Sequence, residues 1–249
     1  MRRAARRERL NRIRVGTAGW AIPRAVADAF PAEGSALERY AARLPAAEIN
    51  SSFYRPHRPA TYARWAAAVP DGFRFSVKLP RSITHDLRLA GVEAELERFL
   101  RDIAGLGAKL GPLLVQLPPS LIFEAGIAAA FLLSLRDRHE GGIALEPRHP
   151  TWFGVEPDEL LREHRVARVA ADPARVPEAA EPGGWPGLVY LRLHGSPRTY
   201  YSSYGEQSLD ALAARLREAA VETWCIFDNT ASGAAAANAL GLLASLEGG

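Results

Sequence analysis

The chain of 249 residues contains one cysteine, one methionine and no long hydrophobic run. A single cysteine cannot form an internal disulfide or a thiolate metal cluster, and it fits a reducing compartment. No segment reaches the ~18 consecutive apolar residues of a membrane-spanning helix, and the N-terminus lacks the apolar core of a signal peptide. We therefore expect a cytoplasmic protein with no membrane partner.

Short motifs that identify a cofactor are also absent. The glycine-containing segment at residues 16–20 lacks the GxxxxGKS pattern of a phosphate-binding loop, so no nucleotide cofactor signature is present. The HxH and HExxH spacings of metal-binding histidines do not occur either. The cofactor therefore stays open, and a divalent metal would have to be held by residues scattered along the chain.

Positive charge is concentrated at the N-terminus. Residues 1–14 hold seven arginines and one glutamate, a net charge of +6, and subtracting this from the +3 of the whole chain leaves −3 for the remainder. We expect residues 1–12 to form a disordered basic tail and residues 13–249 to form one domain. Such a tail can contact nucleic acid or an anionic surface, or it can be a plain solvated terminus.

Predicted strands alternate with predicted helices along the rest of the chain. The eight strands are expected at residues 13–17, 46–50, 73–79, 112–117, 142–146, 166–171, 188–194 and 223–228. The helices are expected at residues 35–44, 60–68, 93–105, 124–138 and 156–164, then from a cap at Ser208, and finally at 231–246. Ser35 and Glu38 have the spacing of a capping box.

Residues 173–186 contain four prolines and two glycines, so a Pro-rich loop replaces the helix after the sixth strand. This order indicates the α/β class and a single (β/α)8 TIM-like barrel, which needs about 250 residues.

Polar and apolar residues alternate within several of the predicted strands. Phe75 and Val77 share one face of the third strand, and Ser76 and Lys78 share the other. A strand buried in a parallel sheet is usually apolar throughout, so this alternation is informative. We assign the apolar faces to the surrounding helices and the polar faces to the barrel interior. The same rule directs Arg168 and Asp172 inward and Cys225 toward the helices.

The inward polar residues should converge at the C-terminal mouth of the barrel, where barrel enzymes place catalysis. The candidate catalytic residues are Glu146, His194, Glu48, Asp172, Asp228 and Lys78. A purely structural alternative is a buried network in which Arg192 and Arg168 neutralise the acids. That alternative explains the arginines well. It explains less well why histidine, lysine, glutamine and several acidic residues all lie at the C-terminal ends of strands. We therefore favour a functional site.

Particular roles can be assigned within this set. His194 is the strongest candidate for a general acid–base group, with Glu146 as its partner. Carboxylates and an imidazole at this place could also orient a substrate or bind Mg²⁺, Mn²⁺ or Zn²⁺. Lys78 could be a Schiff-base lysine if it is desolvated, but a salt bridge to Glu48 or Glu146 is the simpler expectation.

Residues around the predicted mouth are candidates for ligand binding. They are Arg148, His149, Trp152, Arg192, Asn50, Tyr54, His85, Gln116, Trp20, Asn229 and Tyr204. The cationic members, together with free N–H groups at the start of the last helix, favour an anionic small ligand. Aromatic residues on these loops, which include Phe53 and Tyr200, could stack on sugars or bases. Helix capping and core packing are the alternatives for these two groups.

Eight segments together resemble the domain-of-unknown-function 72 (YecE-like) family. They are GTAGW at 16–20, EINSSFY at 48–54, FSVK at 75–78, ITH at 83–85, QLPPS at 116–120, EPRHPTW at 146–152, RLHG at 192–195 and FDNT at 227–230. The resemblance runs from about residue 13 to 246 and implies a TIM-like barrel, but no established reaction. The resemblance implies an asparagine at the end of the last strand. This chain has Asp228 at that position, which adds a possible acid to the site.

Three functional hypotheses follow. The first is an enzyme that performs acid–base chemistry, with or without a metal, on a polar anionic small molecule such as a phosphorylated or sugar-like compound. A hydrolase, a lyase and an isomerase are equally compatible with it. The second is a protein that processes or binds nucleic acid through the mouth and the basic tail. The third is a barrel that binds a ligand without turnover.

Overall fold

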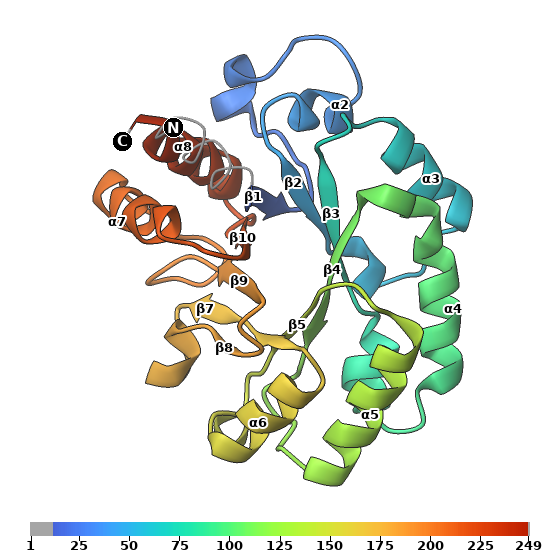
Figure 1. Cartoon of the computed structure of the whole chain (residues 1–249). Helices are drawn as coiled ribbons and strands as arrows, with labels where there is room; N and C mark the ends of the chain where they lie inside the picture. The colour runs from blue at the N-terminus through green and yellow to red at the C-terminus, as the bar shows by residue number, and fades with distance from the viewer. Residues whose placement is uncertain (1–11, 249) are drawn as a thin grey trace.

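One sheet curls into a nearly closed barrel in the computed structural model, which describes residues 12–248 (Figure 1). Within these residues the ten strands are β1 (Ile13–Ala18), β2 (Ala46–Ile49), β3 (Arg74–Lys78), β4 (Leu110–Gln116), β5 (Ile143–Glu146), β6 (Ala167–Arg168), β7 (Ala170–Asp172), β8 (Gly183–Gly184), β9 (Leu188–Leu193) and β10 (Glu222–Phe227). Their hydrogen-bonded order is β7-β9-β10-β1-β2-β3-β4-β5-β6-β8. All pairs are parallel except β6 with β8, which is antiparallel.

The ring of strands stays open at the sixth predicted strand, which is interrupted. β6 pairs with β5 and β7 pairs with β9, and only Val169 lies between β6 and β7 in the chain. The expected Pro-rich loop contains a short 3-10 helix, η6 (Pro177–Ala180), and the strand β8. The predicted count of eight strands therefore differs from the observed ten, because strands of two or three residues have no periodic signal in the sequence.

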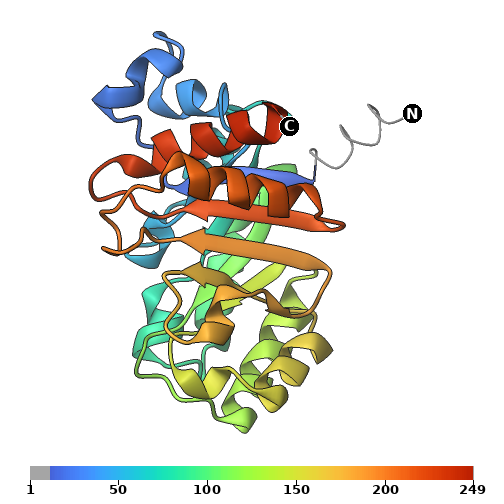
Figure 2. The same ribbon diagram turned by 90° about the vertical axis from the view of Figure 1, so that its left-hand side faces the viewer.

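The helices surround the barrel on its outside (Figure 1). The α-helices of the described region are α2 (Ala36–Ala41), α3 (Pro59–Ala67), α4 (Glu93–Ile103), α5 (Ala125–Arg138), α6 (Val155–Glu163), α7 (Glu206–Arg217) and α8 (Ala234–Gly248). Shorter helical turns are η1 (Arg24–Ala29), η2 (Ser51–Phe53), η3 (Ser82–Asp86), η4 (Ala104–Lys109) and η5 (Pro150–Trp152). Figure 2 shows α7 and α8 side by side along the outside of β9 and β10.

The helix predictions agree with these bounds to within a few residues. Ser35 and Glu38 form both hydrogen bonds of the predicted capping box at the start of α2. The predicted cap at Ser208 was wrong, because α7 begins after Gly205 and contains Ser208. Between Arg12 and Gly248 no helix is long and apolar enough to cross a membrane. The predicted basic tail lies outside the described residues except for Arg12.

Two apolar layers confirm the assignment of strand faces. Phe75, Val77 and Cys225 belong to the large cluster between the strands and the helices. A second cluster joins residues from strands all around the ring, so it fills the barrel interior; it consists of Ala46, Leu114, Ala144, Ala167, Val169, Leu188, Tyr190, Trp224 and Ile226. The alternation therefore predicted correctly which face of β2, β3, β5, β9 and β10 points inward.

The sixth strand is the exception to this rule. Ala167 and Val169 point into the barrel, and Arg168 points outward to Asp158 of α6, with 3.1 Å between Nε and Oδ1. Arg168 also donates to the carbonyl oxygen of Glu178. The expectation that Arg168 and Asp172 face the barrel interior was wrong. A polar side chain can face the helix layer when that layer supplies a partner, and Asp158 supplies one here.

Candidate functional site

The guanidinium of Arg192 lies between three carboxylates inside the barrel. From β9, its Nε and Nη2 donate to Glu48 of β2 at 3.0 and 2.7 Å. Its Nη1 donates to Glu146 at the end of β5 at 2.7 Å, and Nη2 also reaches Asp228 after β10 at 3.1 Å. Arg192 and Glu48 have no solvent exposure. Charges this deep are tolerated only when paired, and the planar fork of arginine can pair with several carboxylates at once.

Two residues below this network hold Glu48 in place. The hydroxyl of Tyr190 donates to Glu48 Oε2 at 3.0 Å, and the Ser76 hydroxyl lies 2.7 Å from the Tyr190 hydroxyl. Ser76 was expected to point inward, and Tyr190 shares the inner face of β9 with Arg192, but the sequence assigned neither residue a role. The available signal was their place on the same inner faces as Lys78 and Arg192.

His194 extends the network toward the mouth. Its Nε2 lies 2.9 Å from Glu146 Oε1, and its Nδ1 lies 3.0 Å from Asp228 Oδ2. Burial lowers the pKa of His194, but Glu146 and Asp228 outweigh this effect, so the pKa lies above its ordinary value. The two carboxylates therefore favour the imidazolium form of His194 over the neutral ring. Arg148 Nη2 also lies 3.0 Å from Nε2.

Both oxygens of Glu146 are fully used. Oε1 accepts hydrogen bonds from His194 and from Arg148 Nη2, the latter at 2.6 Å. Oε2 accepts hydrogen bonds from Arg192 and from Gln116, the latter at 3.2 Å. Burial raises the pKa of Glu146, but the surrounding cations lower it by more, so the pKa lies well below its ordinary value. Glu146 is thus a fixed anion, better suited to holding His194 and Arg148 than to exchanging a proton.

Lys78, the last residue of β3, lies next to this network without joining it. The expected salt bridge to Glu48 or Glu146 is absent, and no ion pair or hydrogen bond of the Lys78 amine is found with any described residue. Its Nζ instead lies 4.0 Å from the centre of the Phe53 ring. Burial and the charge of Arg192 lower the pKa of Lys78 to about 8, against partial compensation by the nearby carboxylates. The prediction of a simple salt bridge was therefore wrong.

The sequence of the chain matches one known protein family over nearly its whole length. The family model described as "Protein of unknown function DUF72" matches residues 14–249. The chain belongs to the DUF72 family. This confirms the resemblance seen in the sequence.

Relatives of this DUF72 chain include proteins of known sequence and of known structure. It is 31% identical over 176 residues to UPF0759 protein YecE of Escherichia coli strain K12, a match that covers 68% of this chain and 62% of YecE. The crystal structure of a DUF72 family protein from Enterococcus faecalis superposes with a TM-score of 0.79 at 25% identity and covers 94% of this chain and 95% of that one. One from Thermotoga maritima gives 0.75 at 27% identity and covers 94% and 99%.

Aromatic residues and a histidine border the mouth of the DUF72 barrel. The Tyr200 ring lies edge-on to His194 with 5.8 Å between ring centres. Tyr54 is 76% exposed and lies against Phe53, and the His85 ring lies 4.9 Å from Phe53. The predicted rim at Tyr54 and His85 is thus next to Lys78.

Other predicted site residues lie away from the mouth. Asp172 accepts a 2.5 Å hydrogen bond from the Tyr204 hydroxyl, in a cavity of about 400 Å³ that α7 borders. Trp152 is buried and donates to the carbonyl oxygen of Leu121, so it is a core residue. The expectations for Asp172 and Trp152 failed because the faces of the interrupted strand are inverted, and because loop aromatics in the sequence do not distinguish rim from core.

Four further candidates have local structural contacts. Nδ1 of His149 caps the turn η5, and Trp20 packs edge-on against Trp65 of α3 with 5.0 Å between ring centres. Asn229 is buried and donates to the carbonyl oxygen of Ser202, which ties two loops together. The Oδ1 atoms of Asn229 and Asn50 are buried without a hydrogen-bond partner.

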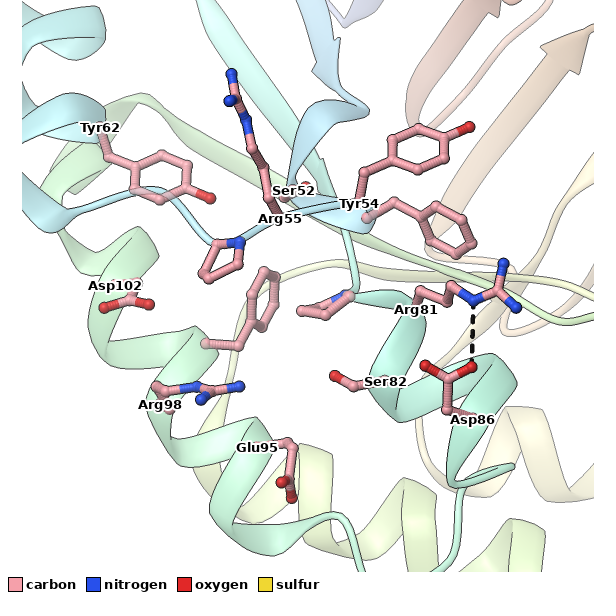
Figure 3. Close-up of a pocket in the computed structure, with 14 residues that line it drawn as sticks. Ser52, Tyr54, Arg55, Tyr62, Arg81, Ser82, Asp86, Glu95, Arg98 and Asp102 are labelled. Carbon is pink, nitrogen blue, oxygen red and sulfur yellow. Dashed lines mark hydrogen bonds and ion pairs between the residues drawn. The ribbon is translucent and has the colours of Figure 1, made fainter.

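A separate cavity of about 250 Å³ lies beside Phe53 (Figure 3). Arg98 and Asp102 of α4 and Tyr62 of α3 line it together with the loops that follow β2 and β3. Figure 3 shows the Tyr62 hydroxyl pointing toward this cavity. Phe53 therefore contacts the amine of Lys78 and also lines this cavity.

The carboxylates of the mouth do not form a metal site in this arrangement. Residues 12–248 contain no group of three or more His, Cys, Asp or Glu side chains placed to hold a metal ion. The guanidinium of Arg192 occupies the space between the carboxylates of Glu48, Glu146 and Asp228. A cation is thus already provided by the chain itself.

The network predicts a loss of stability in acid. The pKa of Glu146 and that of Asp228 are lowered despite burial, by Arg192 and His194 in both cases and by Arg148 at Glu146. A lowered folded-state pKa contributes stability above the unfolded value, here near 4, and that stability is lost as pH falls. We expect the free energy of unfolding, measured in urea at a series of pH values, to fall steeply below about pH 4. The slope should be shallower in Glu146→Gln; an equal slope in both proteins contradicts the assignment.

Proposed function

We propose that the barrel mouth is the active site of an enzyme that performs acid–base chemistry on a polar, anionic small molecule such as a phosphorylated or sugar-like compound. The observation that carries this proposal is Lys78, a nearly buried amine that has no ion pair although the carboxylates of Glu48, Glu146 and Asp228 lie near it. A residue that served only stability would gain from an ion pair with the carboxylates next to it.

Location supports the proposal. Lys78 and Glu146 are the last residues of β3 and β5, and His194 and Asp228 directly follow β9 and β10. Barrel enzymes place their reacting groups at this end of the strands. We further propose to count residues 167–172 as one interrupted strand, which gives an eightfold (β/α) plan with the Pro-rich segment in place of one helix.

Charge supports an anionic substrate. The carboxylates of Glu48, Glu146 and Asp228 are paired with Arg148, Arg192 and His194, so the ammonium form of Lys78 adds a positive charge that has no ion pair of its own. The Arg148 side chain is 13% exposed and pairs with Glu146 through Nη2, while its Nε is buried without a partner. The exposed part of this guanidinium is the natural contact for the negative group of a ligand.

The roles within the site then differ from the simplest acid–base pair. Lys78 accepts or shares a proton, and His194 donates one from an imidazolium that Glu146 and Asp228 hold in place. Arg192 and Glu48 fix the positions of the other groups from below, so their role is structural preorganisation.

A substrate screen tests the proposal. Wild-type protein is incubated with phosphorylated sugars, hydroxy acids and oxo acids, and turnover is followed by NMR. We expect turnover of at least one compound, reduced about 10²- to 10⁴-fold in Glu146→Gln and His194→Ala. His164→Ala, at the far end of α6, is the matched control and should keep full turnover. Full turnover in both site variants contradicts the proposal, and binding without turnover across the panel indicates a receptor instead.

A further inference from the structure

We propose that Lys78 forms an imine with the carbonyl group of an aldehyde or ketone that carries a phosphate or carboxylate group. This inference rests on the active site proposed above and names its substrate class. It explains why the mouth contains an amine without an ion pair rather than a third guanidinium.

The composition of the chain makes this lysine unusual. Lysine occurs at two of 249 positions, Lys78 and Lys109, so 29 of the 31 basic residues are arginines. Arginine provides the charge at every other network position, at 148 and at 192. A guanidinium stays protonated and does not add to carbonyl groups, whereas a lysine amine can lose its proton and then add to a carbonyl carbon. The one position in the mouth that is lysine is thus the one where a nucleophile can be used.

The surroundings of Lys78 suit a nucleophile. The side chain is 5% exposed, and its amine is not among the fully sealed polar atoms that lack a partner, so it keeps contact with solvent. The Phe53 ring positions the charged amine at 4.0 Å but cannot take up its proton or replace an anion. Lys109 offers the contrast, because its amine donates to Pro70 and lies 3.2 Å from Asp71.

The chemistry balances with the groups at hand. The neutral amine adds to the carbonyl carbon, a C–N bond forms, and the carbonyl π electrons move to oxygen, which takes up a proton. That oxygen then takes a second proton and leaves as water, while nitrogen loses one proton and the C=N bond forms, which gives the protonated imine; loss of the second proton from nitrogen gives the neutral imine and restores the proton balance. Nothing is oxidised or reduced, and one water is released for each imine. His194 can supply a proton. Asp228 is hydrogen-bonded to His194, and the charge of Lys78 contributes to lowering the pKa of Asp228.

Reductive trapping tests the inference. The full chain is incubated separately with pyruvate, dihydroxyacetone phosphate, glyceraldehyde 3-phosphate and ribose 5-phosphate in the presence of sodium cyanoborohydride, and adducts are mapped by mass spectrometry. We expect one adduct per chain on Lys78 with at least one compound, at least about tenfold above the adduct on Lys109, because the lowered pKa leaves more neutral amine. Lys78→Arg keeps the charge and should give no adduct at this site while its circular dichroism matches wild type.

The outcomes separate this inference from the proposed function. No adduct on Lys78 with any compound, or equal labelling of Lys78 and Lys109, overturns the imine. If turnover that depends on His194 is found alongside that result, the active site stands and only the imine is wrong. If neither turnover nor an adduct is found, both proposals fall.

Discussion

Replacing Arg192 by methionine should lower the free energy of unfolding by about 3–5 kcal/mol, the usual cost of removing one partner from a buried ion pair. The loss leaves the carboxylates of Glu48, Glu146 and Asp228 without the guanidinium that contacts all of them. Methionine fills a similar volume, so the change reports mainly on charge. Urea denaturation followed by circular dichroism gives the value.

Two matched variants make this result specific. Arg162→Met breaks the exposed pair with Asp158 on α6 and should cost only about 0–1 kcal/mol. Adding Glu48→Gln to Arg192→Met removes one of the stranded charges and should recover part of the lost stability. If Arg192→Met does not fold, Arg192→Lys keeps a charge but not the fork, and it should be less stable than wild type. Equal effects of Arg192→Met and Arg162→Met would show that the network contributes little.

The main parts of the site could be predicted because strand parity is a local rule. A residue on one face of a strand fixes the faces of its neighbours, so Glu48, Lys78, Arg192 and His194 were assigned inward from their own segments alone. The capping box at Ser35 was equally local. Parallel strands that end at the same level then bring such residues together without further information.

The sixth strand shows where local rules stop. Arg168 and Asp172 alternate with small residues as regularly as the inward residues of β9 do, but they face outward. Their partners, Asp158 on α6 and Tyr204 before α7, lie 10 and 32 positions away. Whether a polar side chain points into the barrel or toward the helices therefore depends on which side supplies a hydrogen-bond or ion-pair partner. The sequence of a single strand does not contain that information.

The roles within the site needed geometry as well. From the sequence, Glu146 and His194 form the most plausible proton-exchanging pair. In the structure, four donors occupy both oxygens of Glu146, so the glutamate holds its neighbours instead. Lys78 was expected to be neutralised and is not. Distances of a few ångströms decide between a salt bridge and a free amine, and residue spacing along the chain does not fix them.

The central claim is that the mouth holds a lysine amine that can lose its proton near neutral pH. Burial disfavours the ammonium and the Arg192 charge adds to the effect. Together they outweigh the carboxylates of Glu48, Glu146 and Asp228 and lower the pKa of Lys78 from 10.5 to about 8. A lowered lysine pKa disfavours the folded state below that value, and this cost is relieved as pH rises through it. The shift therefore opposes stability, as expected for a group retained for chemistry.

Titration of Lys78 by NMR tests this claim most directly. With two lysines in the chain, protein labelled with ¹³C-lysine gives two side-chain resonances, and Lys78→Arg assigns them. We predict that the Lys78 resonance titrates with a midpoint at about pH 8, in protein that remains folded throughout. A midpoint at the ordinary lysine value of 10.5 would show that the amine is a plain surface-like cation and would contradict the account.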